Sequence, residues 1–263
     1  MDAAHRIGYL CAMLSYQHAY HAGGPADLHK HIALAELLAL LTRKQRPITY
    51  METHAGRGLY DLAAPESLKT GEAAEGIARI TLPDCPFTTA LQSIRARHGE
   101  TAYPGSPAIA QALLRADDKI HLMELHPAEF AALKRNIDSA AIHRRDGYEG
   151  ILALAPPKPR KGLVLVDPSY EVKSEYLQVA DFTRKLMAKW PEATVMIWYP
   201  ILRAARHREM LDALKLPFIK DEVTFDLKDN KGMTGSGLAL VNAPYGSDAV
   251  FTGTRTLGAP VLR

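Results

Sequence analysis

The chain has 263 residues, 47% of them hydrophobic, so it can bury a substantial core as one large domain or as one domain with an insertion. It has no apolar run of about 18 residues and no secretory signal, and its two cysteines, Cys11 and Cys85, provide no disulfide framework, so we expect a cytoplasmic protein without a membrane partner. The net charge of +3 permits a nucleic-acid partner without requiring one.

The first 46 residues are expected to form an N-terminal extension, a segment that covers the substrate or the cofactor, and the first helix. Residues 1–12 resemble an addition, because Met13 opens a stretch that makes better sense as a start. Tyr16 is available in that stretch to stack or to form a hydrogen bond. The helix is predicted over residues 25–44, because a proline suits its first turn and an apolar stripe follows.

Four histidines in this segment raise the question of a metal site, and they are His18, His21, His29 and His31. Two ligands on one helix face need a spacing of four residues, whereas His29 and His31 point about 200° apart on a helix. No cysteine or carboxylate pair nearby completes a tetrahedral ligand set. We therefore predict no metal and expect an electropositive segment instead.

Three predicted strands end in residues that suit a nucleotide-like cofactor. The strand over residues 47–52 turns into Gly56-Arg57-Gly58, where backbone amides can approach an anion. The second strand ends at Glu124, whose carboxylate can accept hydrogen bonds from both hydroxyls of a ribose. The third ends at Asp146-Gly147, a position suited to contacts with the adenine ring of a cofactor.

Too many residues separate the first two strands for a single crossover helix, so we expect a helical insertion at about 60–101. Its predicted helical stretches are residues 70–80 and about 89–98. After the insertion, Ser106 either caps the next helix, over residues 107–115, or presents its hydroxyl to the cofactor.

The most informative stretch is Leu163-Val164-Leu165-Val166-Asp167-Pro168-Ser169-Tyr170. Its four apolar residues predict a strand buried on both faces, which ends at the edge where open α/β sheets bind ligands. Asp167, the Pro168 carbonyl and Tyr170 offer two hydrogen-bond acceptors and a stacking plate, which suit the exocyclic amine and flat ring of adenine. The motif resembles the Asp-Pro-Pro-Tyr signature of amino-methyltransferases, with Ser169 in place of the second proline.

The rest of the chain is predicted to form a helix over residues 175–189, a strand over residues 193–200, and a hairpin that pairs residues 222–227 with residues 237–242 across a flexible loop at 231–237. Basic residues in the second half of the chain form either a phosphate-facing surface or a solvated face: Arg144, Arg145, Lys158, Arg160, Lys161, Arg203, Arg206, His207 and Arg208.

The glycine turn, the acid, the Asp-Gly pair and the Asp-Pro-x-Tyr motif occur in the order typical of S-adenosylmethionine-dependent methyltransferases. We therefore predict the class I, Rossmann-like α/β fold, with a mostly parallel seven-stranded sheet, helices on both faces, an antiparallel C-terminal hairpin and a small helical insertion. The methyltransferase domain is expected over residues 47–263.

Several segments together resemble the RlmJ family, methyltransferases that modify N6 of one adenine in 23S ribosomal RNA. The matching stretches run from Met13 across nearly the whole chain: 13–16, 21–23, 26–31, 53–56, 76–80, 103–107, 124–127, 146–147, the Asp167 motif, 198–200 and 232–234. Departures from the family pattern lie at Gly24-Pro25, His29 and Ser169.

The resemblance implies a role for individual residues. It places S-adenosylmethionine against Lys30, His31, His54, Gly56, Ser106, Glu124, Asp146, Gly147 and Asp167. It makes Asp167 the catalytic residue, with Pro168 and Tyr170 beside it, and gives Tyr16 and Tyr170 contacts with the RNA.

The expected activity is methyl transfer from S-adenosylmethionine to the N6 amine of an adenine in 23S ribosomal RNA. The partner would be this RNA or an assembly intermediate of the large subunit, and the enzyme would act as a monomer. The alternatives are adenine-N6 methylation of DNA, which the same motif serves, and a catalytically weak RNA-binding protein of the same fold.

Overall fold

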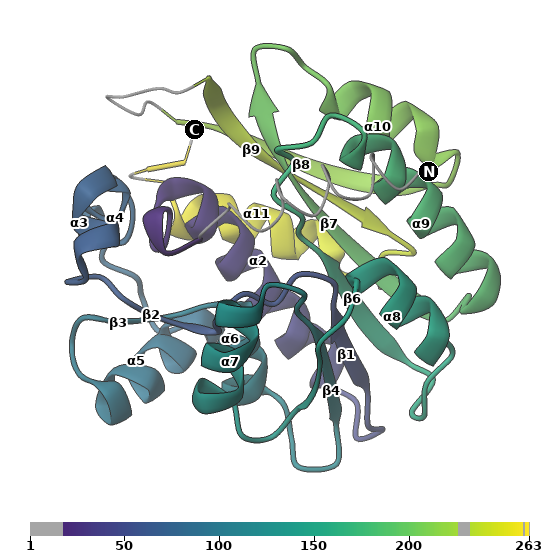
Figure 1. Ribbon diagram of the computed structural model, residues 1–263, viewed down its shortest axis with the longest axis horizontal. Coiled ribbons are helices and arrows are strands. Elements are labelled where there is room, and N and C mark those ends of the chain that lie inside the picture. The colour runs from purple at the N-terminus through teal and green to yellow at the C-terminus, as the bar shows by residue number, and fades with distance from the viewer. Residues whose placement is uncertain (1–17, 226–231, 260, 263) are drawn as a thin grey trace.

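A seven-stranded sheet forms the centre of the computed structural model, which describes residues 18–225, 232–259 and 261–262 (Figure 1). The strand order is β5-β4-β1-β6-β7-β9-β8, and β9 runs antiparallel to its two neighbours while the other pairs are parallel. The strands are β1 (Thr49–Glu52), β4 (Lys119–Met123), β5 (Ala141–His143), β6 (Gly162–Val166), β7 (Ala193–Leu202), β8 (Phe218–Thr224) and β9 (Met233–Val241). The predicted mostly parallel sheet with an antiparallel C-terminal hairpin is confirmed.

The alternation of side chains along β6 explains why helices cover both faces of the sheet. All five β6 residues are buried, as the apolar run predicts. Leu163 and Leu165 join one hydrophobic core, whereas Val164 and Val166 join another, because successive side chains point to opposite faces.

Each of the two cores is closed by its own set of helices (Figure 1). The first contains apolar residues of α2 (Pro25–Thr42), α5 (Pro86–His98), α6 (Ser106–Leu113), α7 (Pro127–Asn136) and α11 (Ser247–Leu257). The second contains those of α8 (Gly147–Leu154), α9 (Glu175–Lys189) and α10 (His207–Leu214). No helix among the described residues is long and apolar enough to cross a membrane.

The segment between β1 and β4 combines short helices with a small second sheet. Strands β2 (Leu59–Asp61) and β3 (Ala102–Pro104) pair antiparallel and enclose it. The helices between them are α3 (Pro65–Thr70), α4 (Glu72–Glu75), the 3₁₀ turn η2 (Ile77–Arg79) and α5. The expected insertion is therefore helical, and the helix predicted at about 89–98 is part of α5. A pair of strands that the sequence did not predict closes its base.

The single helix predicted over residues 70–80 is wrong, because two glycines break it. Gly71 has φ +68 and ends α3 in the left-handed conformation. At Gly76, a Cβ atom would overlap the carbonyl oxygen of Gly23, and the next amide, of Ile77, donates to that oxygen at 2.9 Å. The insertion thus packs directly on the backbone that precedes α2.

Other predicted boundaries differ by a few residues from those observed. The flexible loop expected at 231–237 is wrong from Met233 onward, because β9 begins there to match the long strand β7, which continues to Leu202. Residues 226–227 of the predicted hairpin lie outside the described residues, as do the N-terminal residues 1–12 and Tyr16.

The start of α8 shows how tightly the helices meet the sheet. A Cβ atom on Gly147 would overlap the backbone carbonyl of Thr53, just after β1. We expect Gly147→Ala to lower the free energy of unfolding by about 1–3 kcal/mol, because the backbone contact cannot be relieved by a side-chain rotation. Urea denaturation of the purified protein measures this change.

Gly253 provides the matched control, because it lies inside α11 and a Cβ atom there meets nothing within 4 Å. Gly253→Ala should leave stability unchanged or raise it by about 0.5–1 kcal/mol. Equal effects of the two alanine substitutions would contradict the contact assigned to Gly147.

Candidate functional site

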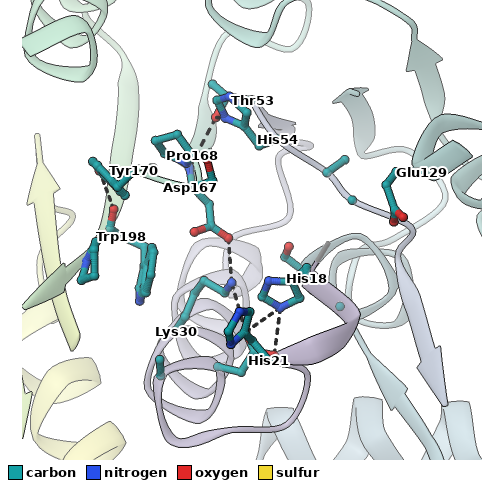
Figure 2. A pocket seen from close by; sticks show the side chains of 18 of the residues that line it. His18, His21, Lys30, Thr53, His54, Glu129, Asp167, Pro168, Tyr170 and Trp198 are labelled. Atoms are coloured by element: carbon teal, nitrogen blue, oxygen red, sulfur yellow. Dashed lines mark hydrogen bonds and ion pairs between the residues drawn. The ribbon is translucent and has the colours of Figure 1, made fainter. Parts of the chain in front are cut away.

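A cleft of about 1570 Å³, open solvent at its mouth included, lies at the carboxyl ends of the parallel strands. Its walls come from β1, β4, β6 and β7 ends, from α2 and from the insertion, as Figure 2 shows for part of the lining. The strand order reverses direction between β1 and β6, which is the switch point where open α/β sheets bind ligands. Thr53 and Asp167, the residues that follow these two strands, both line the cleft.

Asp167 is held by a lysine from α2. Its Oδ2 accepts a hydrogen bond from Lys30 Nζ at 2.6 Å (Figure 2). Lys30 also pairs with Asp27 at 3.2 Å. Burial lowers the pKa of the Lys30 ammonium, but Asp167 and Asp27 raise it more, so the pKa lies above its ordinary value. The family resemblance places S-adenosylmethionine against Lys30, and in the structure the Lys30 ammonium bonds Asp167.

Two acceptors in the Asp167 motif remain available. Among the described residues, none forms a hydrogen bond to Asp167 Oδ1 or to the Pro168 carbonyl oxygen. Both residues line the cleft. Because a backbone carbonyl and a carboxylate oxygen each need a partner when they are removed from water, this part of the cleft is suited to a ligand with two N–H groups.

The glycine turn and Glu124 meet as predicted at the other end of the cleft. The Gly56 amide donates to Glu124 Oε2 at 2.8 Å, and the His126 amide donates to Oε1 at 2.7 Å. Burial raises the pKa of Glu124, and these two amides oppose the shift. Each oxygen keeps a second lone pair, so the carboxylate can still accept from the hydroxyls of a ribose.

His54 lies in the cleft with one ring nitrogen unsatisfied. Its Nδ1 bonds Thr53 Oγ1 at 2.8 Å, whereas the buried Nε2 has no partner in the described structure. Burial lowers the pKa of His54 to about 4, so the ring is neutral at pH 7. An orphaned buried nitrogen in a cleft fits a bound ligand better than an empty site.

His31 and Gly147 also line the cleft, but Asp146 does not. The Asp146 carboxylate caps α8 by accepting from the Glu149 amide at 2.9 Å. His31 Nδ1 bonds the Tyr103 hydroxyl at 3.0 Å, and burial lowers the pKa of its ring to about 3. His31 is therefore a neutral wall residue.

The predicted capping role of Ser106 is wrong, because Gly105 holds the N-cap position and Ser106 begins α6. The Ser106 hydroxyl instead donates to Glu52. The sequence analysis did not identify Glu52 as a residue of the site. Glu52 is fully buried at the end of β1, and the Tyr50 hydroxyl also donates to it at 3.0 Å. Burial raises the pKa of Glu52 to about 8. An acid in an otherwise apolar strand before a glycine turn was the signal that could have identified it.

Tyr170, the predicted stacking plate, lines the cleft but exposes little of its surface there. The residue is 6% exposed, its ring centroid lies 4.5 Å from that of Tyr176, and its hydroxyl donates to the Trp198 carbonyl at 2.7 Å. Tyr170 has φ +56, in the left-handed region, and its ring packs against Tyr176. Trp198 is half-buried and lines the cleft, where it provides the aromatic surface (Figure 2).

Each of the four histidines near the N-terminus has a protein partner. His18 bonds Asp27 at 3.0 Å, His21 bonds Glu72 at 2.8 Å, His29 bonds Asp221 at 3.2 Å, and His31 bonds Tyr103. Within the described ranges, no group of three or more potential ligands is arranged to hold a metal ion.

The fold and the cleft together define a class of enzyme. Counted within the central sheet, the strand order is 3-2-1-4-5-7-6 with the seventh strand antiparallel, which is the arrangement of class I methyltransferases. The glycine turn, Glu124 and the orphaned nitrogen of His54 fit S-adenosylmethionine, the methyl donor of this class. The protein is an S-adenosylmethionine-dependent methyltransferase.

Comparison with known proteins identifies the family within this class. The family model described as "Ribosomal RNA large subunit methyltransferase D, RlmJ" matches residues 45–252, and the chain belongs to this family. The chain is 34% identical to ribosomal RNA large subunit methyltransferase J of Escherichia coli, and the match covers 89% of this chain and 88% of that protein. It is 35% identical to the Haemophilus influenzae protein of the same name, with the same coverage.

A crystal structure of a Legionella pneumophila protein has the same fold. It superimposes with a TM-score of 0.79 at 33% identity, over 91% of this chain and 95% of that one.

The protonation of Glu52 should make stability depend on pH. The folded-state pKa of about 8 lies above the ordinary value of 4.5, so between these pH values the folded protein keeps a proton that the unfolded chain releases. The contribution of Glu52 to the free energy of unfolding therefore falls as pH rises, by up to about 1.4 kcal/mol per pH unit. Glu52→Gln should remove this contribution, so the variant gains stability relative to the parent between pH 5.5 and pH 8.

Urea denaturation of both proteins at several pH values measures the difference between their free energies of unfolding. The titration of all other groups cancels in this difference. A parent and a variant whose free energies of unfolding change in parallel would show that Glu52 is ionised throughout this range.

Proposed function

We propose that this protein transfers a methyl group from S-adenosylmethionine to the N6 amine of an adenine in 23S ribosomal RNA. The observation that carries the proposal is the pair of unsatisfied acceptors, Asp167 Oδ1 and the Pro168 carbonyl, at the switch point of the sheet. An exocyclic amine has two N–H donors, and these acceptors match them. The names of the Escherichia coli and Haemophilus influenzae relatives support ribosomal RNA of the large subunit as the substrate.

The two acceptors explain how a poor nucleophile can react. The N6 lone pair of adenine is delocalised into the ring, which leaves the nitrogen weakly nucleophilic. If Asp167 and the Pro168 carbonyl each accept one N6 proton, the nitrogen becomes more tetrahedral and its lone pair points toward the methyl donor. The carboxylate also stabilises the positive charge that develops on nitrogen, and it is placed to receive the proton that N6 loses.

The cofactor supplies an electrophilic methyl group. We assign its binding to the cleft residues His31, His54, Gly56, Ser106, Glu124, Gly147 and Asp167, with Lys30 acting through Asp167 and Asp146 through the start of α8. Tyr16, which lies outside the described residues, is proposed to govern access of the RNA. We further propose that the enzyme acts as a monomer in the cytoplasm, on 23S RNA or on an assembly intermediate of the large subunit.

Two other functions use the same fold. Methylation of DNA adenine would need the same acceptors, but the relatives are named for ribosomal RNA. Ser169, in place of the second proline of the motif, is the one feature that would suit a weakened, non-catalytic RNA-binding protein. Ser169 lines the cleft, and both acceptors, Asp167 Oδ1 and the Pro168 carbonyl oxygen, are present beside it, which favours an active enzyme.

Replacement of the carboxylate tests the proposal directly. Asp167→Ala should lower the methylation rate of unmodified 23S RNA by at least about 100-fold, because an acceptor for the developing charge is lost. Radiolabelled methyl transfer measures the rate, with duplex DNA as the parallel substrate, and calorimetry measures S-adenosylmethionine binding. A variant that binds the cofactor normally and keeps most of its activity would refute the role of Asp167, and label in DNA would move the enzyme to the alternative class.

The basic residues predicted to form one phosphate-facing surface are divided between two edges of the sheet. Arg160 and Lys161 precede β6, so they lie at the edge opposite the cleft, and both contact Glu192. The prediction that they share a surface with the other arginines is therefore wrong. Arg203 and Arg206 follow β7 at the cleft edge, and no described side chain forms a hydrogen bond or ion pair with either.

We propose that Arg203 and Arg206 bind RNA phosphates beside the target nucleotide. Arg206 acts electrostatically on Tyr176, whose ring packs on Tyr170, so this guanidinium lies near the Asp167 motif. An unpaired arginine beside the catalytic loop is available to a phosphate, whereas one already paired with a carboxylate is not.

Neutralising these arginines should weaken RNA binding without affecting the cofactor. Arg203→Gln and Arg206→Gln should each raise the KM for RNA about 3- to 10-fold and reduce the slope of log Kd against log salt by about 0.7–1. Arg160→Gln is the matched control and should change neither quantity. Steady-state kinetics and filter binding at several salt concentrations test this, and equal effects at Arg160 and Arg203 would contradict the assignment.

A further inference from the structure

A line of hydrogen-bonded polar side chains leads from Trp198 in the cleft, through β9 and α2, to Asp221 on β8. Trp198 Nε1 donates to Ser236 Oγ at 2.8 Å, and Ser236 Oγ bonds His29 Nδ1 at 2.9 Å. His29 Nε2 then bonds Asp221 Oδ2 at 3.2 Å, and Asp221 Oδ1 pairs with Arg255 at 3.0 Å. Ser236 and His29 are fully buried and Asp221 is 2% exposed, so water does not compete for these bonds.

The direction of every bond in this line is determined by chemistry. An indole nitrogen can only donate, so Ser236 Oγ accepts from Trp198. The carboxylate of Asp221 can only accept, so His29 donates from Nε2. Burial lowers the pKa of His29, against the opposing effect of Asp221, and the neutral ring then accepts at Nδ1 the hydroxyl proton of Ser236. The four side chains therefore have one consistent arrangement of protons.

The line ends on the aromatic surface of the cleft. Trp198 and Pro168 both line the cleft, and the Lys30 ammonium lies 5.5 Å from the centre of the Trp198 ring. The Trp198 backbone carbonyl also accepts the hydroxyl of Tyr170. The residue is thus fixed at its ring nitrogen and at its carbonyl, which leaves little freedom for the plane of the indole.

We propose that Ser236, His29 and Asp221 are positioning residues that fix the Trp198 ring as a wall against which the substrate base stacks. The inference rests on the proposed function, because it gives the flat substrate of that reaction its stacking partner. Tyr170 also lines the cleft, but the residue is only 6% exposed, so it offers a flat substrate a smaller face than the half-buried Trp198 does. A preorganised ring loses little entropy when the base binds, so removal of the line should affect binding of RNA more than the chemical step.

The test is a double-mutant cycle of Trp198→Phe and Ser236→Ala, measured as KM for RNA and kcat at saturating RNA. Trp198→Ala should raise KM about 5- to 100-fold, the range expected for one base–aromatic stack. Ser236→Ala alone should raise it about 3- to 10-fold, with kcat and cofactor affinity within twofold of the parent. In the Trp198→Phe background, which has no indole N–H to position, Ser236→Ala should have no further effect.

Thr194→Val is the matched control. Thr194 is buried on β7, the strand that also carries Trp198, and its hydroxyl donates to the Asn242 carbonyl at the end of β7 remote from the cleft. It should leave KM for RNA unchanged. His29→Leu provides a second break in the line if Ser236→Ala folds poorly, and it should raise KM in the same way. An effect of Ser236→Ala that is equal in the parent protein and in the Trp198→Phe background would overturn the proposal.

Tryptophan fluorescence separates this inference from the proposed function. The chain has two tryptophans, and Trp190→Phe leaves Trp198 as the only emitter. Ser236→Ala in that background should increase acrylamide quenching, because the indole is released toward the cleft, and Thr194→Val should not. This readout needs no RNA. Unchanged quenching would therefore overturn the proposed role of Ser236, His29 and Asp221, whereas the absence of any RNA methylation by the parent protein would overturn the proposed function.

Discussion

The ion pair between Lys30 and Asp167 determines how the site is built. It joins α2 to the end of β6, across 137 residues of sequence, and both groups are largely removed from water. A buried ammonium without a partner would be strongly destabilising, so α2 is held over the switch point of the sheet. Asp27 adds a second carboxylate to Lys30 and receives His18, which extends the same network to the chain before the helix.

This network also sets the charge of the part of the cleft around Asp167. Lys30 is a cation between two carboxylates, Asp27 and Asp167, while burial keeps Glu52 protonated and the rings of His31 and His54 neutral at pH 7. One negative charge remains on this inner group of residues. A methyl donor that carries a positive sulfonium is attracted to such an environment, and the neutral histidines do not repel it.

The sequence predicted those features that depend on local pattern. The apolar run of β6, the helix over residues 175–189 and the strand-end position of Glu124 follow from periodicity and from the order of the motifs. The inward turn of Tyr170 could not be predicted, because it depends on Tyr176 and Trp198, which only the folded chain brings against it. Nor could the partners of Lys30 and Ser106, since each bond joins elements whose relative placement only the packed sheet determines.

The contact between the insertion and the chain before α2 has a consequence for the divergence of the family. Gly76 fits against Gly23, the Ile77 amide bonds the same residue, and Glu72 bonds His21. His21 and Glu72 both belong to the cleft wall. The insertion and residues 21–24 therefore form one structural unit: a chimera that exchanges either segment alone with a relative would assemble a mismatched wall, whereas a joint exchange would preserve it.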